Sequence, residues 1–144
     1  MTGPSFTSEI SGCCVQASAR DWARFGHFIV GGARLNGQAI VPDGWFPEAT
    51  TSRTRIGVPG RGYGYQWWTY DDGTFAARSI FAQGIFIDVP RKLVIVSNAN
   101  WGGGARDPAA SSAREAFYRA VQQAVDAEAA AAAGPVSPAS AAGR

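Results

Sequence analysis

Residues 63–98, YGYQWWTYDDGTFAARSIFAQGIFIDVPRKLVIVSN, decide the fold class of this chain. Aromatic residues alternate with their neighbours over 63–68, which is the period of a β-strand. Asp72 and Gly73 then predict a hairpin turn, because glycine takes the positive φ that a two-residue turn requires. The pattern predicts a long second strand over 75–89 and a short buried strand over 93–96. We therefore expect a three-stranded antiparallel meander that other elements must cover.

A helix is predicted before the meander, over 18–30. Ser18 and Asp21 resemble a capping box, and apolar residues follow at helical spacing on one face, with a glycine beside them that allows close approach. A short helix is expected over 42–50, because a proline stands at its first position. Residues 51–62 are expected to form a loop with its arginines in solvent.

A second long helix is predicted after the meander. Asp107 followed by Pro108 is typical of a helix N-terminus. Beyond it, apolar residues recur at helical spacing, so we expect this stripe to pack on the sheet: Ala113, Ala116, Phe117, Ala120, Val121 and Ala124. The fold class is therefore α/β in the α+β sense, an antiparallel meander flanked by N-terminal and C-terminal helices. We interpret residues 1–11 as a leader and 127–144 as a low-complexity tail that frays and becomes disordered.

Composition excludes several classes of protein. Of the 144 residues 46% are hydrophobic and 17% charged, the balance of an ordinary globular domain. A net charge of +2 without a basic cluster argues against a nucleic-acid partner. The chain shows neither a membrane span nor a signal peptide, so we expect no membrane partner and a cytoplasmic location by default. Cys13 and Cys14 are adjacent and cannot form an ordinary bridge, and a single histidine, His27, cannot complete a zinc site.

Motifs for self-contained catalysis are missing from the sequence. Ser-x-x-Lys cannot occur, because the only lysine is Lys92 and position 89 is valine. Neither a Gly-x-Ser-x-Gly elbow nor a His-Glu-x-x-His pair is present, and the glycines at 102–104 lack the spacing of a phosphate loop, so we expect no cofactor and no metal. Asp88 is expected to cap the turn at 90–92. The aromatic residues Tyr63, Tyr65, Trp67, Trp68 and Trp101 are interpreted as core or groove lining, with a sugar-stacking platform as the alternative.

Three segments taken together resemble a known family. Residues 12–45, GCCVQASARDWARFGHFIVGGARLNGQAIVPDGW, precede the strand motif YGYQWW at 63–68, and a long hairpin and a helix follow. Over roughly residues 10–126 this resembles the last third of a penicillin-recognising serine hydrolase. That superfamily contains class C β-lactamases, esterases and DD-peptidases, and the nearest branch in pattern is that of 6-aminohexanoate-dimer hydrolase. The resemblance implies a partial β-lactamase/transpeptidase-like fold whose Ser-x-x-Lys half and tyrosine base are absent from this chain.

The resemblance also implies a site at residues 78–84, RSIFAQG, which align with the family's strand along the active-site cleft. The backbone N–H of Ile80 would be one of two oxyanion-hole donors, and Arg78 and Ser79 would border the substrate. Ser79 and Ala82 stand where the family usually has glycine, which adds a side chain at each position.

Two functions from different classes follow from these observations. In the first, the chain is the C-terminal portion of a serine hydrolase that acts on a small-molecule ester or amide only when the N-terminal half completes it, and it is inactive alone. In the second, it is a non-catalytic binding or interaction module that uses the aromatic strand face. Self-association through exposed apolar surface is also expected if a covering half is missing.

Overall fold

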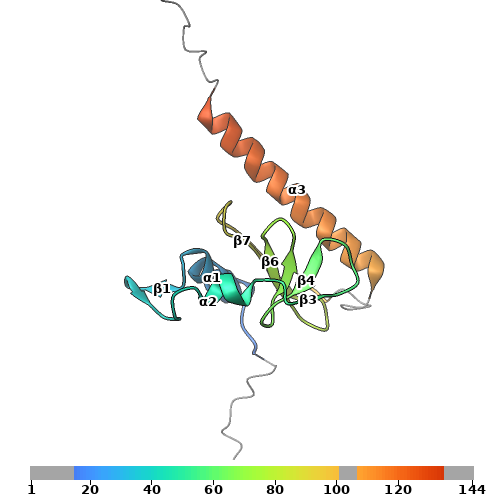
Figure 1. The fold of residues 1–144 in the computed structure, drawn as a ribbon. Coiled ribbons are helices and arrows are strands. Elements are labelled where there is room, and N and C mark those ends of the chain that lie inside the picture. Colours follow the sequence, from blue (N-terminus) through green and yellow to red (C-terminus); the bar gives the residue numbers. More distant parts are fainter. Residues whose placement is uncertain (1–14, 101–106, 135–144) are drawn as a thin grey trace, which may run out of the picture.

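The computed structural model describes residues 15–100 and 107–134, which form a mixed α/β structure around an antiparallel sheet (Figure 1). The sheet has six strands in the order β3-β4-β5-β6-β7-β8, and β1 and β2 form a separate hairpin. The helices are α1 (Ala19–Val30), α2 (Trp45–Ala49) and α3 (Pro108–Ala133). The strands are β1 (Arg34–Leu35), β2 (Gln38–Ala39), β3 (Thr54–Arg55), β4 (Arg61–Tyr63), β5 (Trp68–Tyr70), β6 (Phe75–Arg78), β7 (Gly84–Asp88) and β8 (Leu93–Ser97).

Helices cover the two faces of this sheet and bury two different cores. On the α1 face, Ile29 packs with Phe75, Ile85 and Ile87, and Phe46 of α2 joins this cluster. On the α3 face, a smaller cluster holds Ala76, Phe86 and Tyr118. Strand alternation explains the division, since successive side chains point to opposite faces. The predicted antiparallel sheet with flanking helices is thus confirmed at the level of its layers.

Helix α1 begins where the capping box predicts. Ser18 is the N-cap, and its hydroxyl accepts from the Asp21 amide and donates to the Asp21 carboxylate at 2.6 Å. The hydrogen bond from Ser18, followed by that from Arg24, holds the pKa of Asp21 below its usual value. Gly26 faces the sheet so closely that a Cβ there would lie 2.4 Å from a methyl carbon of Val94. The glycine is therefore needed for the contact between α1 and β8.

The predicted strand over 63–68 is wrong, because it contains a turn. Strand β4 ends at Tyr63 and β5 begins at Trp68, and between them Gly64 N donates to Trp67 O at 2.8 Å while Gln66 has φ +62°. A Cβ on Gly64 would lie 2.2 Å from the carbonyl oxygen of Ala49 at the end of α2. Position 64 therefore requires glycine, and the next amide, of Tyr65, donates to the same Ala49 carbonyl at 2.8 Å rather than to a neighbouring strand.

The predicted long strand over 75–89 is also interrupted, and residues 79–83 form the connection between β6 and β7. Ser79 N donates to Gln83 O at 2.8 Å, and Ala82 N donates to Ser79 O at 2.9 Å. Ala82 has φ +69°, a left-handed conformation that ends the strand alternation. The predicted meander is therefore a chain of hairpins with more and shorter strands.

Two smaller expectations changed, and a third is confirmed. Helix α2 starts at Trp45, after Gly44 with φ +80°, rather than at residue 42. The loop predicted over 51–62 contains β3 and the start of β4, and Arg61 is not in solvent but lies 3.4 Å from Glu115. The Asp88 prediction is confirmed, because this fully buried carboxylate accepts from Arg91 N at 3.1 Å.

Helix α3 is rotated relative to the predicted stripe. Asp107 caps it by accepting from Ala109 N at 2.8 Å, as expected. Its buried residues, however, are Arg114, Glu115, Tyr118 and Gln122, whereas Phe117 is 53% exposed. The prediction that Phe117 and its alanine neighbours face the sheet is therefore wrong.

The physical reason for this rotation lies in the sheet, whose α3 face carries polar groups that only polar helix residues can pair. Gln122, for example, donates to the buried Asp88 carboxylate at 2.7 Å. Helix α3 also continues seven residues beyond Asp126, to Ala133, as an exposed projection. The predicted leader at 1–11, Cys13, Cys14, Trp101, the glycines at 102–104 and the end of the predicted tail at 135–144 lie outside the described residues.

Candidate functional site

The β6–β7 connection holds the residues that the sequence singled out. Residues 79–82 form a β-turn closed by the bond from Ala82 N to Ser79 O. Ile80 and Phe81 occupy its two central positions and are 75% and 55% exposed. The two backbone hydrogen bonds of the connection use the amides of Ser79 and Ala82, so the Ile80 amide takes part in neither. An N–H at the exposed tip of a turn is available to an external acceptor.

The strand that leads into the turn, β6, is not an edge strand of the sheet. Strand β6 is internal, between β5 and β7. Its pairing with β5 nevertheless covers only Phe75 and Ala76, whereas its pairing with β7 continues to Arg78. The last part of β6 is therefore open on the β5 side, directly before the turn.

Arg78 is separated from the turn by the direction of its side chain. It points to the α3 face, where its guanidinium donates to the Glu115 carboxylate and to the Tyr70 hydroxyl. The side chains of Arg78 and Glu115 are only 8% and 6% exposed. Ser79 and Ile80 thus lie together at the turn, whereas the side chain of Arg78 belongs to a buried ionic cluster on the α3 face.

That cluster contains more positive than negative charge. Glu115 also accepts from the Tyr70 hydroxyl at 3.2 Å and lies 3.4 Å from the Arg61 guanidinium. Burial raises the pKa of the Tyr70 phenol, with Arg78 acting in the opposite direction. We define the buried cluster as Arg61, Tyr70, Arg78, Arg114 and Glu115. Its one carboxylate pairs with the guanidiniums of Arg61 and Arg78 and acts on the charge of Arg114 without a direct bond, so Glu115 is the group on which the others depend.

Arg114 connects this cluster to the turn. It is 2% exposed and its Nη1 donates to the carbonyl oxygen of Ala82 at 3.3 Å. Burial, and after it the nearby charge of Arg78, lowers the pKa of Arg114. The Nε atoms of Arg78 and Arg114 have no hydrogen-bond partner among the described residues. Helix α3 therefore fixes the C-terminal end of the turn through a buried arginine.

The aromatic residues of the predicted strand do not share one platform. Trp67 packs edge-on against Phe75 in the core on the α1 face, with ring centroids 5.1 Å apart. Tyr63 and Trp68 form a second edge-on pair at 5.2 Å. Tyr65 lies apart, 43% exposed, at the turn between β4 and β5. The turn at 64–67 causes this division, since a continuous strand would have aligned alternate rings.

Residues 15–100 and 107–134 contain neither a cluster of potential metal ligands nor a membrane-crossing helix. These residues bring together no group of three His, Cys, Asp or Glu side chains that could hold a metal ion. None of the helices described has the length and apolar character to cross a membrane.

Comparison with known proteins adds no family to this picture. No family model matches the chain, and no curated protein matches it. The resemblance to penicillin-recognising serine hydrolases therefore remains a prediction carried by the sequence motifs.

Sequence reasoning missed the buried cluster. Its members come from four elements, and no segment of the sequence contains a recognisable motif for it. The available signal is strand alternation. Arg61 pairs with Tyr70, and Ala76 pairs with both Trp68 and Phe86. Because Tyr70 and Arg78 lie two residues from Trp68 and Ala76, the strand members of the cluster share one face of the sheet. The helix contribution gave no signal, because Arg114 and Glu115 resemble solvent-exposed residues.

Proposed function

We propose that the chain forms the C-terminal part of a β-lactamase-like serine hydrolase, with the corresponding partial β-lactamase/transpeptidase-like fold. The complete protein transfers the acyl group of an ester or amide to water through an acyl-serine. The serine, lysine and tyrosine base belong to a preceding half, since this chain has only Lys92 and no Ser-x-x-Lys. The chain contributes one wall of the cleft and one oxyanion donor, the Ile80 N–H.

The observation that carries the proposal is the conformation of the turn at 79–82. The Ile80 amide lies at an exposed tip and is not used by the two hydrogen bonds of the connection. A fixed backbone N–H of this kind stabilises an oxyanion as charge develops, and loss of one such donor commonly lowers kcat by about 10²–10³. Because Arg114 holds the Ala82 carbonyl, this donor is held in place before any substrate arrives.

The two departures from the family pattern are compatible with this role. Ala82 has φ +69°, so the backbone keeps a conformation that glycine favours although alanine stands there. Ser79 does not have a positive φ, so its side chain brings no such strain. Ser79 as a substitute nucleophile is disfavoured, since no hydrogen bond links its hydroxyl to a lysine or histidine within the described residues.

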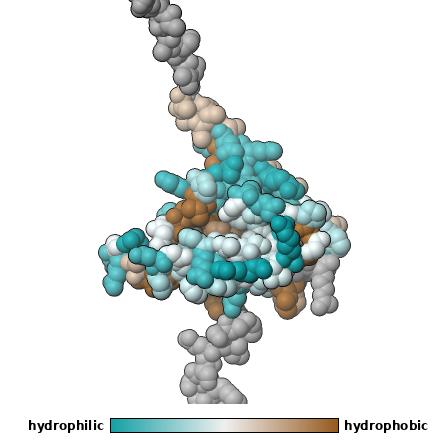
Figure 2. Space-filling model, viewed as in Figure 1, coloured by the Kyte–Doolittle hydropathy of each residue, from teal (hydrophilic) through white to brown (hydrophobic). Residues whose placement is uncertain are grey.

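Exposed apolar surface supports a missing covering half. Ile80, Phe81 and Phe117 each expose more than half of their surface. Figure 2 shows hydrophobic surface gathered between α3 and the layer of α1 and α2, amid a mostly hydrophilic exterior. Such surface favours association. Size-exclusion chromatography with a dye for exposed apolar surface separates the two functions: dye binding or oligomers support a partial domain, and a dye-negative monomer supports an independent module.

The first experiment uses the purified chain with a p-nitrophenyl ester and a chromogenic cephalosporin. We expect no turnover above buffer. Turnover that survives Ser79→Ala contradicts the absence of a nucleophile from this chain. Turnover that Ser79→Ala abolishes identifies Ser79 as the nucleophile instead.

The second experiment reads the nucleotide sequence upstream of residue 1. An in-frame Ser-x-x-Lys supports the proposal, and the longer protein then tests Ile80. Ile80→Pro removes the N–H at the turn position where proline is favoured, so the turn is retained. We expect kcat to fall by about 10²-fold or more, whereas Ile80→Ala, which keeps the N–H, retains most of it. Equal rates for Ile80→Pro and the unmodified protein would exclude Ile80 as a donor.

A further inference from the structure

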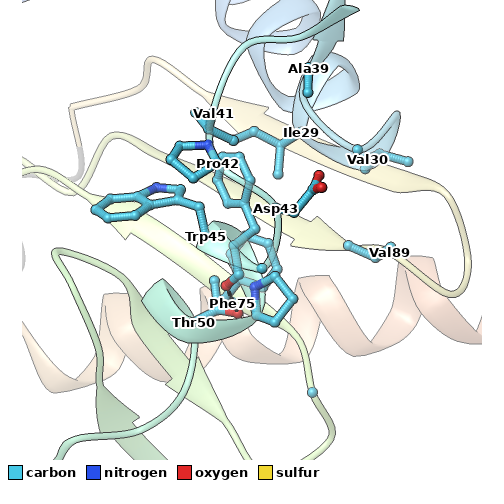
Figure 3. A pocket seen from close by; sticks show the side chains of 15 residues that line it. Ile29, Val30, Ala39, Val41, Pro42, Asp43, Trp45, Thr50, Phe75 and Val89 are labelled. Carbon is cyan, nitrogen blue, oxygen red and sulfur yellow. Dashed lines mark hydrogen bonds between the residues drawn. The ribbon is translucent and has the colours of Figure 1, made fainter. Parts of the chain in front are cut away.

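A cavity on the α1 face of the sheet is separate from the turn at 79–82. Its volume is about 330 Å³, and it lies between the end of α1, the β1–β2 hairpin, α2 and the tips of two hairpins of the sheet (Figure 3). This volume is at the small end of the range for ligand pockets, roughly 300–1,000 Å³. The cavity is therefore large enough for a small molecule.

The lining of the cavity is predominantly apolar. Ile29 and Phe75, which belong to the buried core, line it together with Val30 at the end of α1 and Val89 in the turn after β7. Phe46 of α2 lies against the same core. A ligand that fits here must present an apolar body, because these surfaces offer no hydrogen bond.

Asp43 is the one charged residue among the described residues that line this cavity. Figure 3 shows its carboxylate between Val30 and Val89. Asp43 is exposed, and its carboxylate makes no hydrogen bond or ion pair with any residue in the described ranges. The hydroxyl of Thr50, another polar group of the lining, is already used, because it donates to Phe46 O at 2.7 Å. The polar group that this cavity offers to a ligand is thus an acceptor that carries negative charge, the Asp43 carboxylate.

We propose that this cavity binds a small protonated amine with an apolar body, such as an arylalkylamine. The apolar part fills the space against Ile29 and Phe75, and the ammonium group pairs with Asp43. A neutral ligand of the same shape leaves the carboxylate partly desolvated without a partner, and an anion is repelled. This inference does not depend on the proposed hydrolase function, because the cavity shares no residue with the turn at 79–82.

The test is a titration of the ¹⁵N-labelled chain, followed by NMR, with 2-phenylethylamine, 2-phenylethanol and 3-phenylpropionate. We expect the amine to shift the amides of Val30, Gly44 and Val89 and to bind about threefold more tightly than the alcohol, the range for an exposed ion pair. The anion is expected to bind most weakly. Shifts that map elsewhere, or equal affinity for amine and alcohol, overturn the proposal.

Two controls isolate the carboxylate. Asp43→Asn is expected to remove the preference for the amine, whereas Asp71→Asn, an exposed aspartate outside the cavity, is expected to keep it. About 1 M salt should also remove the preference in the unmodified chain, because the Debye length falls to about 3 Å. This arm remains decisive if Asp43→Asn disturbs the fold. A preference that persists in high salt, or in a folded Asp43→Asn variant, contradicts the pairing with Asp43.

Discussion

Replacing the buried Glu115 by glutamine should destabilise this protein more than the same replacement at Glu48, which is exposed. Glu115 is the single carboxylate of the buried cluster, with a side chain that is 6% exposed. It accepts from Arg78 and from the Tyr70 hydroxyl, and Arg61 lies 3.4 Å away. Glu115→Gln preserves the shape of the side chain and one acceptor but removes the charge. Two guanidiniums are then left facing each other without a counterion.

The size of the effect follows from the burial of the pair. Removing one partner of a buried ion pair costs about 3–5 kcal/mol, because the remaining charge stays desolvated. The retained amide oxygen places Glu115→Gln near the lower end, about 3 kcal/mol. Glu48→Gln is the matched control: Glu48 pairs with Arg53 at 3.3 Å, but their side chains are 56% and 47% exposed. An exposed pair contributes at most about 1 kcal/mol.

Urea denaturation followed by circular dichroism measures both variants. We expect a large fall in midpoint for Glu115→Gln with an unchanged m-value, and a small one for Glu48→Gln. Adding Arg78→Met to Glu115→Gln should cost less than the sum of the two single changes, because the double variant no longer buries the unpaired Arg78. Equal costs for the two glutamine variants, or strict additivity in the double variant, would refute the view that Glu115 compensates buried charge.

Three further predictions test the register and contacts of the helices. Tyr118→Ala should lower the free energy of unfolding by about 3–5 kcal/mol and Phe117→Ala by less than about 1, because these neighbours are 3% and 53% exposed. The reverse order in urea denaturation would show that the predicted apolar stripe of α3 faces the sheet. Gly26→Ala should lower stability by about 1–3 kcal/mol despite its better helix propensity, because its Cβ would lie 2.4 Å from a methyl carbon of β8; an unchanged thermal midpoint contradicts this contact. The hydrogen bond from Ser18 lowers the pKa of Asp21 below 3.8, so the stability that ionised Asp21 contributes is present above about pH 4 and is lost as the pH falls through the lowered pKa. Asp21→Asn should therefore flatten the acid limb of a pH–stability curve. An unchanged slope would exclude Asp21 as the source of that pH dependence.

Local signals in the sequence predicted the N-termini of α1 and α3 well. Ser18 and Asp107 both act as N-caps, because their side chains satisfy amides within three residues. Gly26 on the apolar face of α1 correctly indicated close approach to the sheet. A hairpin turn is also present where Asp72 and Gly73 predict it, with Gly73 at φ +82°, but it spans Tyr70 to Gly73 rather than two residues, because Gly73 N donates to Tyr70 O at 3.1 Å. Each of these features is decided by neighbours in sequence.

Features decided by distant contacts were not predictable in the same way. Period-two alternation continues through 63–68 and 75–89, yet both segments turn: the first where the Ala49 carbonyl excludes a side chain, the second where Ala82 is left-handed. Alternation shows only that a segment can form a strand. The carbonyl that interrupts the first strand comes from α2, and no rule of local spacing contains it.

The face of α3 shows the same limit for helices. An apolar stripe predicts the buried face only when the partner surface is apolar. Here the partner surface carries Arg78 and Asp88, which require Glu115 and Gln122 above them, so the polar side of the helix turns inward. The apolar side is left exposed, and a covering half of the kind proposed above would give it a partner.

The buried cluster also determines where β6 ends and the turn at 79–82 begins. Arg78 is held towards α3 by Glu115, and the next amide, of Ser79, donates to Gln83 O rather than to a strand. At the other end of the turn, Arg114 holds the Ala82 carbonyl. The turn that carries the Ile80 N–H is thereby held near both of its ends by side chains of α3. Loss of Glu115 should therefore broaden or shift the Ile80 and Ala82 amide resonances at low urea, before global unfolding, whereas Glu48→Gln should leave them unchanged. If Glu115→Gln lowers stability but leaves these two resonances in place, the turn is held by its own hydrogen bonds and the cluster only anchors α3.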